Sequence, residues 1–206
     1  MIKKLTFVHL TLCALFSISF QVHSKEIKVP TPKGAKSACQ NNESYRRALD
    51  KSVPGGNLID CFYDEKTIER DEVNDDSVRY FVYTSKYWEG RDVSPDDARK
   101  FILGAKKRAK NTEKYEQLVN GITVKTEGVS AKIYKHSYNM LIYRKIQMVS
   151  IDGVPQKENV SISGVVYTQG MVYTLAVNHS VNVNLNSNEI YENAINWISS
   201  FVLQNK

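Results

Sequence analysis

Two cysteines are the residues of this chain most capable of covalent chemistry. Cys39 and Cys61 lie near the two ends of the segment SACQNNESYRRALDKSVPGGNLIDCFY, residues 37–63. Such a pair can form a structural disulfide, contribute half of a metal site, or act as a reactive thiol pair. The spacing is wrong for a CxxC redox motif, and two cysteines are too few for a four-ligand zinc site. In an oxidising compartment the pair therefore predicts one disulfide that is structural and not part of a reaction.

The first 24 residues indicate that compartment. The segment MIKKLTFVHLTLCALFSISFQVHS begins with Lys3 and Lys4, continues with an apolar run of roughly a dozen residues and ends in small residues before a cleavage position near Ser24. The run is shorter than the roughly 20 residues of a membrane-spanning helix, which favours a removed signal peptide over an anchor. Cys13 lacks the context of a lipid-attachment site. We expect a periplasmic or secreted protein that does not span the membrane.

The other reactive side chains form none of the common catalytic motifs. After Ser24 the histidines are His136 and His179, which stand outside any HxxxH or HExxH arrangement, and no GxSxG, SxxK or GxxxxGK[ST] motif occurs. The acids of residues 69–76 are candidates for general acid and base roles or for calcium binding. They lack the glycine and the alternating spacing of a calcium loop. We expect no catalytic residues, no metal site, no cofactor and no enzymatic activity.

The segment KYWEGRD, residues 86–92, is the candidate partner-binding loop. Trp88, Glu89 and Arg91 lie there between a predicted strand and a predicted helix. Trp and Arg are frequent anchors of binding surfaces, because an indole buries a large area and a guanidinium forks to carboxylates. In the alternative arrangement, Trp88 packs over the core and Arg91 pairs with Glu89 or Asp92.

Charge is distributed unevenly along the chain. The sequence has 28 basic and 22 acidic residues, with 42% apolar and 24% charged residues overall, which is enough to bury an ordinary core. Residues 64–76 are strongly acidic and residues 99–114 strongly basic. This distribution, together with the leader, argues against a nucleic-acid partner. The basic stretch is either a solvated face or a contact for anionic envelope polymers or lipid headgroups.

The elements that must position these residues mix helix and strand. Period and composition predict strands in KEIKVP (25–30), NLIDCFY (57–63) and SVRYFVYTSKY (77–87), the last with both faces covered. NNESYRRALDKS (41–52) carries an Asn cap signal and predicts a helix. A longer helix begins at Ser94, with Pro95 at its first position, and continues past an interruption at 111–112 to Gly121.

From residue 122 the pattern changes to successive strands. Four strands are predicted up to residue 181, with tight turns around Asp152-Gly153 and Gln169-Gly170. A final amphipathic helix covers the resulting sheet. Its apolar stripe consists of Ile190, Ala194, Trp197, Ile198, Phe201 and Val202. The expected fold class is α+β, one antiparallel sheet covered by helices, in a single domain over 25–206 with an N-terminal lobe (25–121) and a C-terminal meander plus helix (122–206).

Part of this pattern resembles a known family. The hairpin GVVYTQGMVYTLAVNHS and the closing helix AINWISSFV resemble the PsbP-like proteins, best over residues 122–204. That resemblance implies an α/β/α sandwich and a role as an assembly or binding factor, and it carries over no site residues. The segments VPTPKG, GGNLIDCFY and VRYFVYTSK resemble small exported bacterial proteins of an uncharacterised family.

Three functions follow as hypotheses. The first is a non-catalytic exported domain that binds a protein or a cell-envelope partner. The second is an immunity-type inhibitor of a toxin delivered into the periplasm, since such inhibitors are small, exported and often disulfide-bonded. The third is a hydrolase with a carboxylate-based site in residues 69–76. The missing catalytic motifs and the family resemblance favour the first.

Overall fold

A computed structural model describes residues 26–40, 42–53, 55–70, 77–111, 114–119, 122–180 and 187–206. The predicted signal peptide, residues 1–24, and the acids of residues 71–76 lie outside these ranges.

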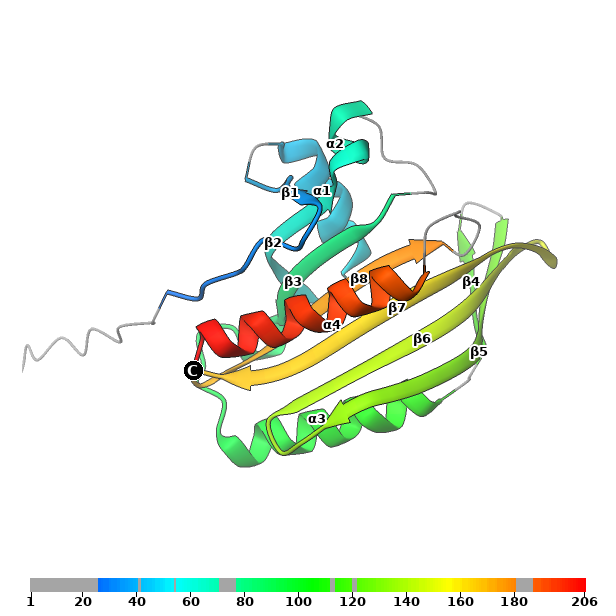
Figure 1. Ribbon diagram of the computed structural model, residues 1–206. Helices are drawn as coiled ribbons and strands as arrows, with labels where there is room; N and C mark the ends of the chain where they lie inside the picture. Colours follow the sequence, from blue (N-terminus) through cyan, green and yellow to red (C-terminus); the bar gives the residue numbers. More distant parts are fainter. Residues whose placement is uncertain are drawn as a thin grey trace, which may run out of the picture.

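Eight strands form one antiparallel sheet in the order β1-β2-β3-β8-β7-β6-β5-β4 (Figure 1). The strands are β1 (Ala35–Ser37), β2 (Gly56–Asp64), β3 (Arg79–Ser85), β4 (Lys114–Val119), β5 (Ile122–His136), β6 (Met140–Ile151), β7 (Val154–Thr168) and β8 (Met171–Ser180). The helices are α1 (Glu43–Ser52), α2 (Glu65–Arg70), η1 (Lys86–Trp88, a 3-10 helix), α3 (Pro95–Lys110) and α4 (Ser187–Gln204).

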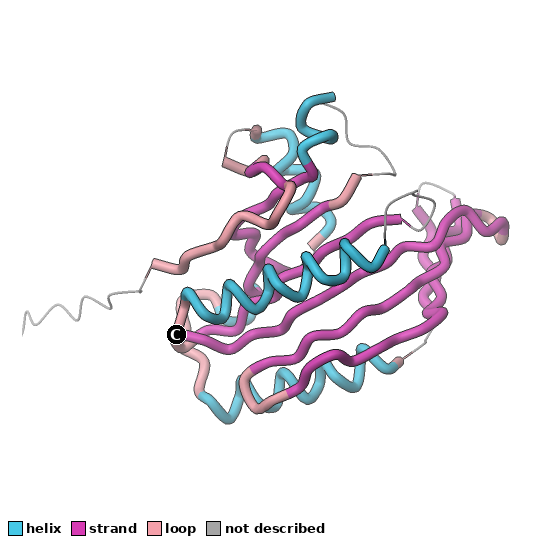
Figure 2. Tube along the Cα trace, viewed as in Figure 1, coloured by secondary structure: helices cyan, strands magenta, loops and turns pink. Residues whose placement is uncertain are grey.

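Helices cover both faces of the sheet. Helix α4 lies across one face, and α1 and α3 lie over the two ends of the other face (Figures 1 and 2). Strand β3 is internal, because it pairs with β2 on one side and with β8 on the other. The predicted fold class, an antiparallel sheet with helices on both faces and one disulfide, is confirmed.

The stripe on α4 forms the larger core. Trp197 packs edge-to-face on Tyr80 of β3, with 5.5 Å between the ring centroids, and on Phe62 of β2 at 6.3 Å. Ile198 and Phe201 are fully buried. Edge-to-face contacts of this kind add to the stabilisation from apolar burial. The predicted assignment of Trp197 to the core is confirmed.

The first described segment is not a strand, which corrects one prediction. Residues 26–32 run as an extended loop beside α4 (Figure 2). Lys28 exchanges two hydrogen bonds with the buried Asn205 side chain, at 2.9 and 2.7 Å, and the Trp197 indole donates to the Pro30 carbonyl at 2.6 Å. Two prolines in this stretch have no N–H to donate to a sheet, so the segment is held by side chains instead.

The two helices on the opposite face begin at the predicted caps. The Asn42 carboxamide accepts the Ser44 backbone N–H at 3.0 Å at the start of α1. The Ser94 hydroxyl accepts the Asp97 N–H at 3.1 Å, and Pro95 occupies the first turn of α3. These contacts satisfy amides that have no partner within the helix.

The predicted continuation of α3 is wrong. The helix ends at Lys110, and residues 114–119 form β4, which pairs with the first residues of β5. Lys114 forms an ion pair with Glu127 across these two strands at 3.2 Å. Pairing with a long neighbouring strand outweighs the weak helical preference of so short a segment.

The hairpin turns follow the sequence signals. Asp152 and Gly153 have φ values of 47° and 79°, and Gln169 and Gly170 have values of 50° and 74°. Two successive residues with positive φ match the right-handed twist of the flanking strands. The turns therefore set the registers of β6 with β7 and of β7 with β8.

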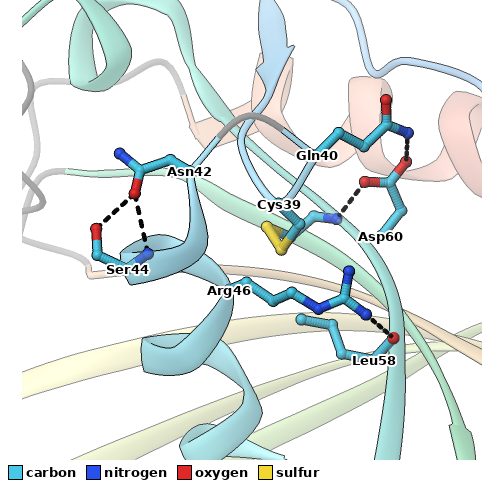
Figure 3. The surroundings of a disulfide bond; sticks show 8 residues. Cys39, Gln40, Asn42, Ser44, Arg46, Leu58 and Asp60 are labelled. Carbon is cyan, nitrogen blue, oxygen red and sulfur yellow. Dashed lines mark hydrogen bonds between the residues drawn. A yellow bond between two sulfur atoms is a disulfide. The ribbon is translucent and has the colours of Figure 1, made fainter.

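The disulfide joins the segment after β1 to the middle of β2 (Figure 3). Cys39 and Cys61 are both buried, and their Cα atoms lie 5.2 Å apart. Beside them, the buried Asp60 accepts a hydrogen bond from the Cys61 N–H at 2.8 Å and one from the Gln40 amide at 3.2 Å. Burial raises the pKa of Asp60, and these hydrogen bonds lower it in part. The predicted Cys39–Cys61 pairing is confirmed.

Within the described ranges, we find no helix with the length and apolar character needed to cross a bilayer.

We predict that Gly164→Ala and Gly104→Ala have opposite effects on stability. A Cβ at Gly164 of β7 would lie 2.5 Å from Ile198 Cγ2 of α4, so the helix must shift. The free energy of unfolding should therefore fall by about 1–3 kcal/mol. A Cβ at Gly104 of α3 meets only the movable Arg108 guanidinium, so Ala should stabilise by up to about 1 kcal/mol. Urea titration measures both, and equal effects would contradict the close packing of α4 on β7.

We also predict that the Cys39→Ala and Cys61→Ala double variant loses about 3 kcal/mol of unfolding free energy. The bridge closes a loop with a sequence separation of 22, and removing it restores the entropy of that loop in the unfolded chain. Urea titration of the oxidised protein and of the variant measures this. Reduced wild-type protein is the control and should resemble the variant; a variant as stable as oxidised protein would refute the expectation.

Candidate functional site

Trp88 points inward from η1. Its ring packs edge-to-face on Phe101 of α3, with 6.3 Å between centroids, and on Tyr87 at 4.6 Å. It is part of the apolar cluster beneath α3 together with Val93 and Ile102. The indole is therefore held by packing between β3 and α3 and not presented on an exposed loop.

Glu89 and Arg91 lie on the outside of the same connection. Both are exposed, and the Arg91 guanidinium stacks over the Tyr87 ring at 5.8 Å. No ion pair joins Arg91 to Glu89 or Asp92 among the described residues. The structure thus separates the three loop residues, with Trp88 facing the sheet and the other two facing solvent.

A groove lies over the middle of the sheet between α1 and α3, and Trp88 forms part of its wall. Its volume is about 460 Å³, within the range of about 300–1,000 Å³ that is usual for small-molecule sites. The groove exists because α1 packs mainly on β2 and α3 packs on β5 to β7, which leaves β8 and the adjoining parts of β3 and β7 between the two helices.

The floor of the groove consists of small and mostly polar side chains. They come from alternate positions of β7 and β8 and are Ser161, Ser163, Val165, Val172, Thr174, Ala176 and Asn178. Strand pairing places Ser163 opposite Ala176 and Ser161 opposite Asn178. Because successive side chains point to opposite faces, this polar row shares two strands with the apolar row that packs under α4.

The walls are aromatic and carry one cation. They contain Phe81 and Tyr83 of β3, Trp88, Phe101 of α3 and Tyr143 of β6. The Arg108 guanidinium, also in the lining, lies 5.7 Å from the centre of the Phe101 ring. Such walls suit a flat or aliphatic apolar group.

Two buried polar atoms in the lining lack a hydrogen-bond partner among the described residues. They are the Trp88 indole N–H, a donor, and the Asn178 side-chain oxygen, an acceptor. Buried polar groups are nearly always satisfied in folded proteins. The groove lining therefore contains one donor and one acceptor whose hydrogen-bonding capacity is unused among the described residues.

A second depression of about 260 Å³ adjoins the groove and shares Ser161 and Asn178 with it. Its lining adds Arg79, Lys157, Asn159, Gln147 and Ser180, among others. In neither lining, as far as the described residues show, does an acidic side chain occur. Among the described residues, the charged side chains of the two linings are therefore the cations Arg79, Arg108 and Lys157.

The Tyr83 hydroxyl in the groove lining is partly removed from water. Burial raises the pKa of its hydroxyl, the nearby Tyr143 hydroxyl raises it further, and a hydrogen bond with Thr174 and the charge of Arg108 lower it. Electrostatic and hydrogen-bonding contacts are stronger in such a site than in water.

The remaining reactive side chains lie apart from one another. His136 ends β5 and contacts the Lys106 ammonium through Nδ1 at 3.2 Å. Glu69 of the proposed acidic site forms an exposed ion pair with Lys36 at 3.6 Å, and the rest of that run lies outside the described residues. In the described ranges, no three side chains of His, Cys, Asp and Glu come together as metal ligands would.

The sequence analysis did not predict the groove, although the alternation of polar and apolar residues in two of its strands indicates it. Ser161 and Ser163, and likewise Thr174 and Asn178, alternate with large apolar residues in strands that are buried on both faces. A polar row facing a layer of helices indicates that the helices do not cover it.

The comparisons with known proteins identify a fold likeness and no family. No protein-family model matches the chain, and no curated protein matches its sequence. One similar solved structure is the solution structure of cyanobacterial PsbP (CyanoP) from Synechocystis sp. PCC 6803, with a TM-score of 0.37 and 11% identity over 80% of this chain and 81% of that chain. A likeness at this level carries no conclusion about function.

We predict that His179, which lies at the end of the second depression, makes stability depend on pH. Burial lowers the pKa of His179, and a hydrogen bond to the Ser180 carbonyl opposes this in part. Below the ordinary histidine pKa of about 6.5 the unfolded chain binds a proton that the folded chain excludes. The unfolding free energy should therefore fall as pH drops from about 7.5 to about 5.

Urea titration of wild-type protein, His179→Gln and His136→Gln measures this. Loss of His179 should flatten the pH dependence, whereas the exposed His136 serves as the matched control and its loss should preserve it. An unchanged slope in His179→Gln would contradict the assignment.

Proposed function

We propose that this protein is a non-catalytic binding domain that holds a cell-envelope partner in the groove between α1 and α3. The observation that carries the proposal is the groove itself, about 460 Å³ in volume, with the unpaired Trp88 donor and Asn178 acceptor in its lining. A preformed concave site with aromatic walls and a few polar groups that fix orientation is a common form of a binding site.

Trp88 lines this site and serves as an anchor for the partner. Its packing on Phe101 fixes the ring, so that little conformational entropy is lost when a partner binds. Arg91 stacks on Tyr87 outside the groove and serves at most at its rim. The binding loop of the original hypothesis thus contributes one anchor, and the strands contribute the rest.

A periplasmic or secreted location fits this role. Disulfides persist in oxidising compartments, and Cys39–Cys61 is such a bond. Cleavage of a signal peptide near Ser24 would place the groove among envelope components. We therefore propose that the partner is met after export.

The two other functions have less support. No contact among the described residues favours a toxin-binding surface over the groove. For a carboxylate-based hydrolase, Glu69 is exposed and paired with Lys36 of β1, and neither residue lines the groove. Binding of a protein or envelope ligand in the groove explains the groove and its unsatisfied polar atoms, whereas the toxin-inhibitor and hydrolase functions do not.

We predict that Trp88→Ala abolishes partner retention and that Tyr87→Ala does not. The two aromatics are neighbours on η1, but Trp88 lines the groove, whereas Tyr87 is 67% exposed and does not. Detergent extract of the cell envelope is passed over immobilised wild-type protein and each variant, and the retained species are compared by mass spectrometry. Equal retention by wild-type protein and Trp88→Ala, with both folded by circular dichroism, would refute the groove as the site.

A further inference from the structure

The side chains that line the groove change character along β8. The positions that face it are Val172, Thr174, Ala176, Asn178 and Ser180. Alternate residues of a strand lie roughly 6.6 Å apart, so this row extends over about 26 Å. It begins among aromatic walls and ends among amide and hydroxyl groups.

The polar end also concentrates positive charge. Strand pairing places Arg79 opposite Asn178, Asn178 opposite Ser161, and Ser161 opposite Lys145, in one row across β3, β8, β7 and β6. Lys157 lines the same end. Arg79 and Lys145 flank the Ser161 hydroxyl, a neutral donor, in that row, and no acid occurs in the described lining, which favours an anion.

We propose that the groove binds a small amphipathic anion: a molecule with an apolar body and one terminal acidic group, such as a carboxylate, phosphate or sulfonate. The apolar body lies against Trp88 and Phe101, and the acidic group lies between Arg79 and the Ser161 hydroxyl. This proposal rests on the proposed function, because it names the ligand class of the same site.

The strand pairing argues against an extended peptide as the occupant. Peptides that bind sheets add a strand to an unpaired edge, where backbone groups are free. Each floor strand is paired on both sides, β3 with β2 and β8, β8 with β3 and β7, and β7 with β8 and β6. The floor therefore presents side chains only, as a small-molecule site does.

Two fluorescent probes with the same aromatic body test the proposal. Anilinonaphthalene sulfonate carries one anionic group, and N-phenylnaphthylamine lacks it. The rise in fluorescence of each probe on transfer out of water reports binding, and loss of that signal in Trp88→Ala, with Tyr87→Ala as the control that keeps it, places the probe in the groove. We expect wild-type protein to bind the sulfonate about tenfold more tightly than the neutral probe, with the difference shrinking at high salt.

Variants locate the acidic group. Arg79→Gln should abolish the preference for the sulfonate and leave the affinity for the neutral probe unchanged. Arg47→Gln, which removes an exposed arginine paired with Glu43 on α1, is the matched control and should retain the preference. If Arg79→Gln does not fold, the isosteric Asn178→Asp serves instead, since a carboxylate at that point should repel the sulfonate.

The outcomes separate this proposal from the proposed function. Equal affinity for both probes in wild-type protein, or a preference that survives Arg79→Gln and Asn178→Asp, overturns the anion assignment while the groove remains a binding site. Binding of neither probe, with a polypeptide retained from envelope extract by wild-type protein and lost in Trp88→Ala, overturns the small-molecule assignment alone. Retention that is indifferent to Trp88 overturns the proposed function.

Discussion

The structure depends on how the two faces of one sheet are buried. Helix α4 covers one face along its length, whereas α1 and α3 cover only parts of the other. Both faces of its central strands carry apolar side chains, and each face must be removed from water by a second layer. Helix α4, with 18 residues, is long enough to lie along β7 and β8 and to cover the core beneath it. Its packing is close, since only a glycine at position 164 admits Ile198 against β7.

The opposite face is covered differently, and the groove is the result. Helix α1 is held near β2 by the disulfide, and α3 is held against β6 and β7 by its own apolar side. Parts of β3, β8 and β7 stay uncovered between the two helices. Uncovered apolar side chains there would be exposed to water, and the chain places serines, a threonine and an asparagine at those positions instead. These polar side chains can face water without a large cost in stability, and they can also form hydrogen bonds with a ligand.

Local signals in the sequence predicted the elements that depend on near neighbours. Asn42 and Ser94 began their helices, the turns at Asp152 and Gln169 set the hairpins, and the spacing of Trp197 among small and aliphatic residues placed it in the core. The failures occurred where distant partners decided the outcome. Residues 114–119 became a strand because β5 was available to pair with, and residues 26–32 stayed unpaired because Asn205 and Trp197 bound them.

The sequence by itself determined the disulfide partners, the antiparallel meander, the final helix and the α+β class, because caps, turns and apolar periods act over a few residues or recur along one element. Only the tertiary structure decided the site. Arg79, Trp88, Ser161 and Asn178 belong to segments far apart in the chain, and their meeting depends on β3 pairing with β8 and on the distance between α1 and α3. That distance is set by packing of whole layers, which no local pattern encodes.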